Sequence, residues 1–425
     1  MSQLTRTFEL IFIILIEAIS GARGVILVKL ERMTADNQCT RLQPIRVLHY
    51  MGTNFGMTGV ETFILNLCAA QRRSGLILPS IAMDLKDRDE VRNIATSYGI
   101  EVHDLPTRRG TNGKALSGGL AKLWSLVQTT QAIRKLLRHS HMIHIHAVGI
   151  SCIDGFIARG LSHEKKLVVT HHATLSWFAA HRSTVSDLTF WLEKSMASRV
   201  IMPYRAAAKE LVAQGLSEKQ SKVIPFCVDE ELFCGLAPEP APEELTLVMS
   251  ARMFRGKGHI ELLAALATLS PRYPKLRAVF VGDGPTRPAI EAEIDRLNLQ
   301  HAVEIRGRVD HRQVPAIMRN AHVVVLPSYM EGEMFPLCLL EGMALGLPAI
   351  GTRYSGIPEI IVDGETGILV EPRDEIGLAH AIERFLVEPA FYLNAKRSAR
   401  ARAQSFSATA VARTYLEQYE ATMRE

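Results

Sequence analysis

Short aliphatic runs alternate with longer amphipathic stretches through most of this 425-residue chain. Each run is long enough for one buried strand, and the stretches between the runs carry apolar residues at helical spacing. The alternation begins at Ile45 and starts again at Leu245. A chain of this length exceeds what a single hydrophobic core usually fills. The pattern therefore predicts an α/β fold with two facing Rossmann-like domains and a cleft between them.

Composition shifts divide the chain into parts. Residues 45–237 form the predicted first domain, 238–244 a proline-rich linker that is expected to act as a hinge, 245–405 the second domain, and 406–425 a final helix. Residues 1–44 precede the first strand. Their apolar run, Leu10–Ile16, is too short to span a bilayer. Three interpretations stay open: a partly buried leader helix, a weak interfacial anchor, or sequence upstream of the true start.

Two acidic residues follow the predicted buried strand His322–Leu326. Glu333 lies in the turn after this strand, and Glu341 lies inside the predicted helix Phe335–Ala344. Open α/β sheets bind ligands at the carboxyl ends of their strands, so the two carboxylates are candidates for a binding site. The structural alternative is a dipole-compensating acid in the first turn and a solvated helix residue.

A basic loop follows the first strand of the second domain, Leu245–Ala251. It contains Arg252 and Lys257, which suit a diphosphate because Arg offers a fork of donors and Lys a compact charge. A basic surface loop is the alternative. Gly282 begins the turn after the second strand of this domain, and Gly307 follows the third strand. Both glycines are candidates for contact with a nucleotide.

The first domain opens with a strand, a glycine-bearing loop and a helix. The loop contains Gly52, Gly56 and Gly59, and the helix spans about Val60–Arg73. Glycines let a backbone approach an anion closely, and the helix N-terminus offers free N–H donors. The spacing is not G-x-G-x-x-G, and strand-loop-helix units with glycines are common, so the loop alone favours an ordinary turn over a phosphate site.

Four histidines belong to two neighbouring strands of the first domain. His144 and His146 lie two apart on one strand and point to the same face, whereas His171 and His172 follow the strand Leu167–Thr170. A histidine at a carboxyl end faces the ligand crevice, while one within a strand usually packs. His172 is therefore the better functional candidate, and His171 is the alternate. His144 is the better structural candidate. His146 lies between these two interpretations.

Several of these segments carry motifs of one known family. The motifs are the Glu333/Glu341 pair with seven residues between, Arg252 with four residues before Lys257-Gly258, TGVE at the first helix, VVTHHAT and GDGP. These segments resemble motifs of the retaining nucleotide-sugar glycosyltransferases of family 4, the glycosyl transferases group 1. KVIPFCVD is similar to a further motif, with Phe226 and Cys227 in place of Asn and Gly. The resemblance covers the chain from about Ile45 to its end and implies the GT-B fold.

The resemblance also implies roles for individual residues. Arg252 and Lys257 would bind the diphosphate of the donor, Glu341 the ribose, Glu333 the sugar, and His172 the sugar or the incoming hydroxyl. The implied donor-binding set is Gly59, Arg252, Lys257, Gly282, Gly307, Glu333, Phe335, Pro336, Leu337 and Glu341, with His172 joining Glu333, Arg252 and Lys257 as catalytic residues. As in relatives, the final helix would pack back on the first domain.

Charge indicates the kind of partner. The chain carries a net charge of +5, and residues 101–200 contain thirteen Lys and Arg against six Asp and Glu. Such a field suits an anionic partner. The segment Arg108–Arg138 predicts a core-facing amphipathic helix with a solvated cationic face, or a helix that docks on anionic lipid. We expect a nucleotide-sugar donor and a saccharide or lipid-linked acceptor, with no nucleic acid.

Metal and cofactor are not expected. The segment Asp87-Arg88-Asp89 resembles a metal-binding D-x-D, but it lies in a charged run typical of a solvated loop. The six cysteines form no C-x-x-C pair and fit a reducing cytosol. The expected location is cytoplasmic, or peripheral at the inner face of the plasma membrane.

Taken with the resemblance, these features predict an enzyme that moves a hexose from a nucleoside diphosphate sugar to an acceptor hydroxyl with retention, in cell-envelope or exopolysaccharide biosynthesis. A non-hydrolysing nucleotide-sugar epimerase shares the architecture and remains an alternative. A non-catalytic nucleotide-binding regulatory protein is a second one.

Overall fold

The computed structural model describes residues 43–52, 59–85, 89–106, 119–147, 152–162, 164–173, 184–240 and 244–425. Parts of several sequence predictions lie outside these residues: the leader up to residue 42, Gly56 of the glycine loop, Asp87 and Arg88 of the D-x-D segment, the first part of the segment Arg108–Arg138, and residues 241–243 of the linker.

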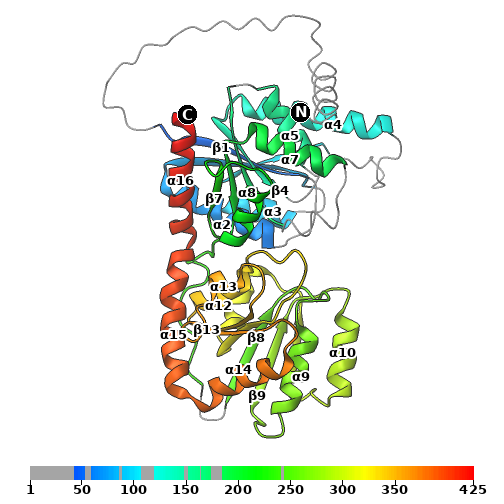
Figure 1. Cartoon of the computed structure of the whole chain (residues 1–425), viewed down its shortest axis with the longest axis vertical. Coiled ribbons are helices and arrows are strands. Elements are labelled where there is room, and N and C mark those ends of the chain that lie inside the picture. The colour runs from blue at the N-terminus through cyan, green and yellow to red at the C-terminus, as the bar shows by residue number, and fades with distance from the viewer. Residues whose placement is uncertain are drawn as a thin grey trace, which may run out of the picture.

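The first domain is built on a seven-stranded sheet whose order is β3-β2-β1-β4-β5-β6-β7. All neighbouring strands are parallel. Helices alternate with the strands along the chain and cover the sheet (Figure 1). The elements are β1 (Ile45–Met51), α2 (Gly59–Ser74), β2 (Ile77–Met83), α3 (Asp89–Ser97), β3 (Glu101–Asp104), α4 (Gly119–Leu137), β4 (Met142–Ala147), α5 (Ile153–Gly160), β5 (Lys166–His171), α7 (Thr184–Met196), β6 (Arg199–Met202), α8 (Arg205–Ala213) and β7 (Ser221–Val223).

The second domain repeats this architecture on a six-stranded parallel sheet of order β10-β9-β8-β11-β12-β13. Its elements are β8 (Leu245–Ser250), α9 (His259–Leu269), β9 (Leu276–Val281), α10 (Arg287–Arg296), β10 (Val303–Gly307), η2 (His311–Gln313), α11 (Val314–Met318), β11 (Val323–Leu326), α12 (Leu337–Ala344), β12 (Ala349–Thr352), α13 (Ile357–Ile360), β13 (Gly367–Val370), α14 (Glu375–Val387) and α15 (Pro389–Ala403), and the chain then continues through η3 (Gln404–Phe406) and α16 (Ala408–Arg424).

The strands are apolar because helices cover both faces of each sheet. β6, β11 and β12 are buried along their whole lengths. Parallel strands that are buried on both faces consist of continuous aliphatic runs. These runs allowed both domains to be predicted from the sequence. The two Rossmann-like domains confirm the predicted fold class.

The end of the chain returns to the first domain. Figure 1 shows α15 beside the second domain and α16 beside the first. Where the chain passes from α15 to α16, a β-bridge joins Ser407 to Val228. The Ser407 side chain also caps α16 by accepting a hydrogen bond from Ala410 N at 3.2 Å. Further along α16, the Tyr419 hydroxyl lies 3.4 Å from Gln71 Nε2 of α2.

The start of the helix that carries Glu341 differs from the prediction. The helix that carries Glu341 begins at Leu337, not at Phe335. Pro336 precedes it in an extended conformation, and Phe335 comes before a proline, a position that disfavours helical dihedrals. Phe335 therefore belongs to the turn together with Glu333.

Within the described residues, every helix is too short or too polar to span a lipid bilayer.

Candidate active site

The centre of the candidate site is a buried ion pair in the second domain. Lys257 Nζ lies 2.8 Å from Glu333 Oε2, and the two side chains are 14% and 8% exposed. Ser328 Oγ donates a second hydrogen bond, also 2.8 Å long, to the same carboxylate oxygen. Lys257 comes from the loop after β8, whereas Ser328 and Glu333 follow β11, the neighbouring strand. The carboxyl ends of adjacent parallel strands thus bring the predicted cation and acid together.

Gly258 makes this approach possible. Its φ of 93° lies in the left-handed region, and a Cβ built on it would lie 2.4 Å from the carbonyl oxygen of Pro327. Only glycine combines this dihedral with such a close backbone contact. The loop that carries Lys257 is therefore packed directly on the segment that leads to Ser328.

Glu341 has a partner that the sequence did not reveal. His311 Nε2 lies 2.9 Å from Glu341 Oε1, and both groups are largely buried. The pKa of His311 is raised: burial, the largest influence, lowers it, but the hydrogen bond and negative charge of Glu341 outweigh burial, with help from Asp229 and Asp310. His311 lies on η2, thirty residues before Glu341, in a segment without a recognisable motif.

Cys338 connects the two acids in space. Burial raises the pKa of its thiol, with the negative charges of Glu341 and Glu333 acting in the same direction and the positive charge of Lys257 opposing them. The charges of the ion pair and of Glu341 therefore act on the same buried thiol at the start of α12.

Arg252 occupies a more open place. It is exposed, and its guanidinium carbon lies 4.4 Å from the centre of the Phe254 ring. Among the described residues it makes no ion pair with Glu333 or Glu341. Gly282 lies beside Arg252, since a Cβ on Gly282 would be 3.5 Å from the Arg252 amide nitrogen and 2.1 Å from the Ala251 oxygen.

The predicted glycines lie at two separate sheet edges. Gly282 N donates a hydrogen bond of 2.8 Å to Gly307 O, so these two positions lie side by side after β9 and β10. Gly59 starts α2 in the first domain, and no atom lies within 4 Å of a Cβ built on it. The preceding loop residues 53–58 lie outside the described chain.

Aromatic rings link the turn that contains Glu333 to the first domain. The Phe335 ring meets the Phe226 ring edge-on at 6.2 Å, and Phe226 stacks on His172 at 5.0 Å. Pro336 caps α12, and Leu337 is its first residue. The predicted His172 thus lies one aromatic ring away from the turn that contains Glu333.

His172 and its neighbour His171 face different environments. His171 Nε2 lies 2.6 Å from Glu193 Oε1 of α7, a buried contact of structural character. His172 Nε2 lies 3.0 Å from His146 Nδ1, and burial, with the charge of His171, lowers the pKa of His172 to about 3. His172 is therefore neutral at physiological pH.

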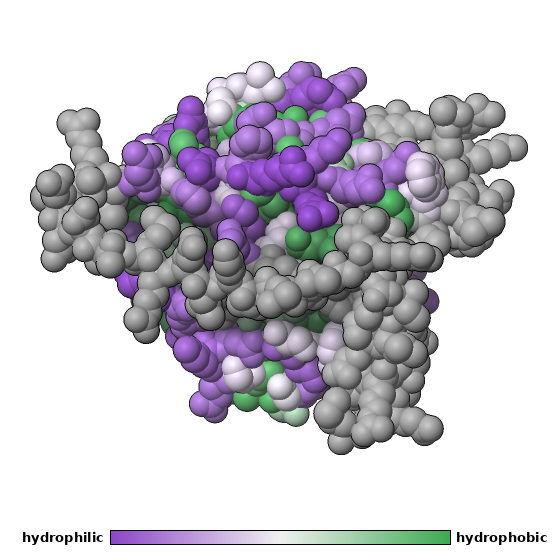
Figure 2. Space-filling view, turned by 90° about the horizontal axis from the view of Figure 1, so that it is seen from above, coloured by the Kyte–Doolittle hydropathy of each residue, from purple (hydrophilic) through white to green (hydrophobic). Residues whose placement is uncertain are grey.

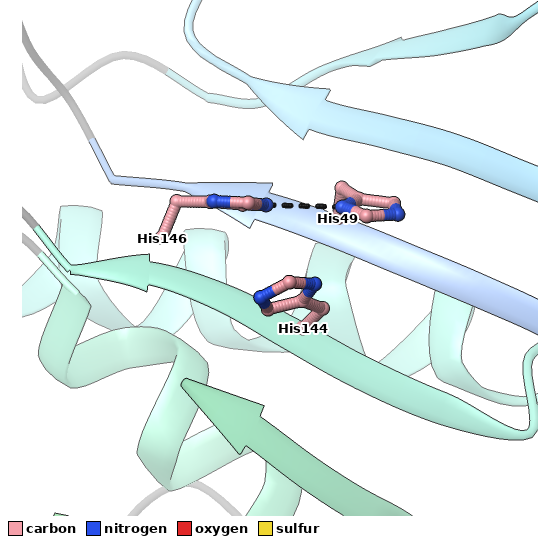
Figure 3. A group of neighbouring side chains, drawn as sticks. All are labelled: His49, His144 and His146. Atoms are coloured by element: carbon pink, nitrogen blue, oxygen red, sulfur yellow. Dashed lines mark hydrogen bonds between the residues drawn. The ribbon is translucent and has the colours of Figure 1, made fainter. Parts of the chain in front are cut away.

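Three further histidines cluster beneath His172. Figure 3 shows His49 of β1 with His144 and His146 of β4, and one ring nitrogen from each lies within 4.8 Å of the others. Three neutral imidazoles at this spacing are a donor set that could hold a metal ion. However, each of the six ring nitrogens already makes a hydrogen bond within the protein, so an ion would have to replace these bonds.

Two family models match the chain, one for each domain. Glycosyltransferase Family 4 matches residues 57–232, and Glycosyl transferases group 1 matches residues 237–403. The fold and the models define a two-domain glycosyltransferase of the GT-B type. The chain belongs to glycosyltransferase family 4, as its motifs predicted.

Curated relatives agree on the class of reaction. The chain is 24% identical over 348 residues to one of the subunits of phosphatidylinositol N-acetylglucosaminyltransferase from Arabidopsis thaliana, covering 81% of this chain and 74% of that protein. It is 29% identical to glycogen synthase of Mycobacterium tuberculosis over 279 residues, 64% of this chain and 62% of that enzyme. The match to 2-deoxystreptamine N-acetyl-D-glucosaminyltransferase of Niallia circulans is 28% identical and covers 73% of this chain and 82% of that enzyme.

Solved structures agree on the fold. Anabaena HepE in complex with UDP superimposes with a TM-score of 0.72 at 20% identity, covering 89% of this chain and 100% of that one. HepE in complex with UDP-glucose gives the same TM-score at 19% identity, with 88% and 99% coverage.

Proposed function

We propose that the chain is a retaining hexosyltransferase that uses a nucleoside diphosphate sugar and transfers the hexose to an acceptor hydroxyl. The observation that carries this proposal is the buried pair of Lys257 and Glu333, held at 2.8 Å at the carboxyl edge of the second sheet. A cation for the diphosphate and an acid for the sugar hydroxyls lie in direct contact there. The complexes of HepE with UDP and UDP-glucose support a donor of this chemical class.

In this proposal, the two basic residues bind the diphosphate. Lys257 exchanges its contact with Glu333 for phosphate oxygens, and the exposed Arg252 closes on the diphosphate from solvent. The backbone N–H of Gly59, where α2 begins, adds a donor from the first domain. Gly282 and Gly307 leave room for the nucleotide beside Arg252.

The acids bind the two sugar rings of the donor. Glu341, fixed by His311, accepts hydrogen bonds from the ribose hydroxyls, and Glu333 accepts them from the hexose. Phe335, Pro336 and Leu337 provide the turn and the first helix residues that hold Glu333 in place. His172 contacts the hexose or the incoming hydroxyl from the first domain.

The transfer step is a front-face displacement. The acceptor oxygen forms a bond to the anomeric carbon while the bond from that carbon to the phosphate oxygen breaks, and the acceptor proton moves to the leaving phosphate oxygen. Arg252 and Lys257 stabilise the negative charge that develops on the diphosphate, and each such preorganised contact contributes about 3 kcal/mol. Because these cations supply the positive charge, we propose that transfer needs no metal ion and no other cofactor.

The proposed acceptor is a saccharide or a lipid-linked saccharide of the cell envelope or an exopolysaccharide, at the cytoplasmic face of the membrane. On α4, Trp124 is 64% exposed, and Lys135 and the first residue after the helix, Arg138, are also exposed. The end of the molecule seen in Figure 2 is mostly hydrophilic, with smaller hydrophobic areas between. The exposed Trp124 and the two exposed basic residues support peripheral contact with anionic lipid, which sedimentation with anionic and neutral vesicles would test.

A thermal-shift panel of UDP, GDP and ADP sugars tests the donor. A ligand that binds only the folded protein raises its apparent stability, so the correct donor should raise the melting temperature more than its free sugar does. Incubation of that donor alone then separates the alternatives. An epimer without nucleotide release indicates an epimerase, and binding without turnover on any acceptor indicates a regulatory protein.

A further inference from the structure

A continuous chain of buried hydrogen bonds runs from helix α2 to His172. Gln71 Oε1 lies 2.9 Å from His49 Nε2, His49 Nδ1 lies 3.0 Å from His146 Nε2, and His146 Nδ1 lies 3.0 Å from His172 Nε2. Gln71, His49 and His146 are at most 1% exposed, and His172 is 7% exposed. The chain therefore lies almost entirely outside the reach of solvent.

Burial keeps the histidines of this chain neutral. Their ring nitrogens contact an amide oxygen and other imidazoles, which are uncharged partners that do not stabilise an imidazolium. A neutral imidazole carries one N–H and one lone pair, so each ring donates at one nitrogen and accepts at the other.

The amide oxygen of Gln71 therefore sets the direction of every bond. Because Oε1 only accepts, His49 must carry its proton on Nε2 and accept at Nδ1. His146 must then donate from Nε2 and accept at Nδ1, and His172 must donate from Nε2. This leaves Nδ1 of His172 with a lone pair.

The C-terminal helix supplies the partner of the Gln71 amide nitrogen. Gln71 Nε2 donates to the Tyr419 hydroxyl at 3.4 Å, and that hydroxyl lies 2.7 Å from His144 Nδ1. His144 Nε2 in turn lies 2.8 Å from Thr170 Oγ1. A 180° turn of the Gln71 amide would reverse every bond, so that His172 would present an N–H at Nδ1 instead of a lone pair.

His172 Nδ1 is the one end of the chain left open. It is buried and has no hydrogen-bond partner among the described residues. A buried polar atom without a partner is costly unless a ligand satisfies it. The His172 ring stacks on Phe226, which meets Phe335 beside Glu333, so this ring lies next to the domain junction.

We propose that Gln71, His49 and His146 are positioning residues that fix the tautomer of His172, so that its Nδ1 accepts a hydrogen bond from a sugar or acceptor hydroxyl. This inference rests on the proposed function for its catalytic consequence but not for the tautomer itself. The C-terminal helix takes part through Tyr419, so the sequence end of the chain helps to set the state of a first-domain site.

The tautomer can be measured without any substrate. Ring-¹⁵N histidine labelling separates a protonated nitrogen from one with a lone pair, and the His172 signals are identified by their loss in His172→Phe. We expect a single Nε2–H form in the wild type. The matched variants are Gln71→Glu, which keeps an acceptor towards His49, and Gln71→Met, which removes it at nearly the same volume.

The expected result is that Gln71→Glu keeps the wild-type His172 tautomer while Gln71→Met and His146→Phe introduce the Nδ1–H form. If His146→Phe does not fold, Gln71→Met, three hydrogen bonds away from His172, still decides the question. A His172 tautomer unchanged in Gln71→Met would overturn the proposal. So would a stoichiometric metal ion found by elemental analysis of the purified protein, because His49 and His146 cannot share both a metal ion and a hydrogen bond at these nitrogens.

Kinetic measurements then separate a positioning role of Gln71 from a purely structural role. With the donor identified by the panel of UDP, GDP and ADP sugars, Gln71→Met should lower kcat on the order of tenfold, the effect of losing one hydrogen bond of ordinary strength in the transition state, and leave the KM for the donor within about twofold. Gln71→Glu should restore most of kcat. Loss of activity in both variants together with unchanged tautomers would show that Gln71 acts only through stability. Complete absence of turnover in the wild type would instead count against the proposed function and leave the tautomer result standing.

Discussion

Lys257 Nζ and Glu333 Oε2 lie 2.8 Å apart although 76 residues separate them in the chain. In the proposed mechanism, a bound donor competes for both groups, since the diphosphate attracts the ammonium and the sugar hydroxyls need the carboxylate. Donor binding would therefore exchange one buried ion pair for two sets of ligand contacts. This relationship makes different predictions for the two residues.

Glu333→Gln should abolish transfer while leaving nucleotide affinity largely intact. The amide keeps the shape of the side chain but loses the charge that binds the sugar, and Lys257 becomes free for the diphosphate. We expect kcat to fall by about 100-fold or more, the size of effect seen when one preorganised contact is removed. Calorimetry with the nucleotide diphosphate and steady-state kinetics measure the two quantities, and an undiminished turnover number would reject the assignment.

Lys257→Met should weaken nucleotide binding and also destabilise the second domain. Removing one partner of a buried pair leaves the other charge uncompensated, which costs about 3 kcal/mol. Among the described residues, the Glu333 carboxylate would keep one hydrogen bond, from Ser328. The double variant Lys257→Met/Glu333→Gln should therefore be less destabilised than the sum of the single variants in urea unfolding. Strict additivity would mean that the pair contributes nothing to stability.

The contact between His311 and Glu341 predicts a pH-dependent contribution to stability. The pKa of His311 in the folded protein is raised above its usual value of 6.5, so the protonated form is favoured by folding. The stability gained is fully present below about pH 6.5 and is lost as the pH rises through the folded-state pKa. The difference in free energy of unfolding between the wild type and His311→Gln should shrink from acidic to alkaline pH. A difference that grows with pH would contradict the assignment.

The sequence predicted the parts of the site that depend on local pattern. Lys257 and Glu333 each follow a buried strand, and adjacent parallel strands carry them to one edge. His144 and His146 share a face because strands have a period of two. The predicted helix began at Phe335, two residues before the observed start of α12. Apolar residues lie on both sides of Pro336, and this pattern outweighed the tendency of a proline to end helical structure before it.

Other parts of the site depend on packing and left no local signal. His311 reaches Glu341 only because η2 packs near α12, and no motif surrounds it. Gln71 and Tyr419 meet across 348 residues, where α16 returns to α2. Long-range polar contacts of this kind arise from tertiary structure, which neither spacing nor hydrophobic period encodes. Arg252 is a different case: its assigned role stays a prediction, because its side chain is exposed and makes no ion pair with the acids among the described residues.

Chelation should leave transfer unaffected. Arg252 and Lys257 are the proposed source of positive charge on the leaving diphosphate, so saturating EDTA is expected to change kcat by less than about twofold, well below the effect of losing one charge-stabilising contact. The measurement is acceptor-dependent release of nucleotide, with and without added Mg²⁺ or Mn²⁺. Activity that disappears in EDTA and returns with a divalent ion would contradict a metal-independent mechanism.

Gly258→Ala should disrupt the site by separating the Lys257 loop from Pro327. Two effects act on this substitution: the positive φ of 93°, and the Cβ that would lie 2.4 Å from the Pro327 carbonyl oxygen. Gly364 is a matched control, because its φ is also positive, at 74°, but nothing lies within 4 Å of its Cβ. Gly364→Ala should cost only the left-handed conformation, about 1 kcal/mol.

Gly258→Ala should lower the free energy of unfolding in urea by more than Gly364→Ala does. The reason is that the backbone at Pro327, rather than a flexible side chain, must move. Gly258→Ala should also lower kcat, because Lys257 and Glu333 are held together by this loop contact, whereas Gly364→Ala should leave kcat unchanged. Equal losses of stability in the two variants would show that the dihedral alone accounts for Gly258. Normal kcat in Gly258→Ala would show that the ion pair does not depend on the close approach of the two loops.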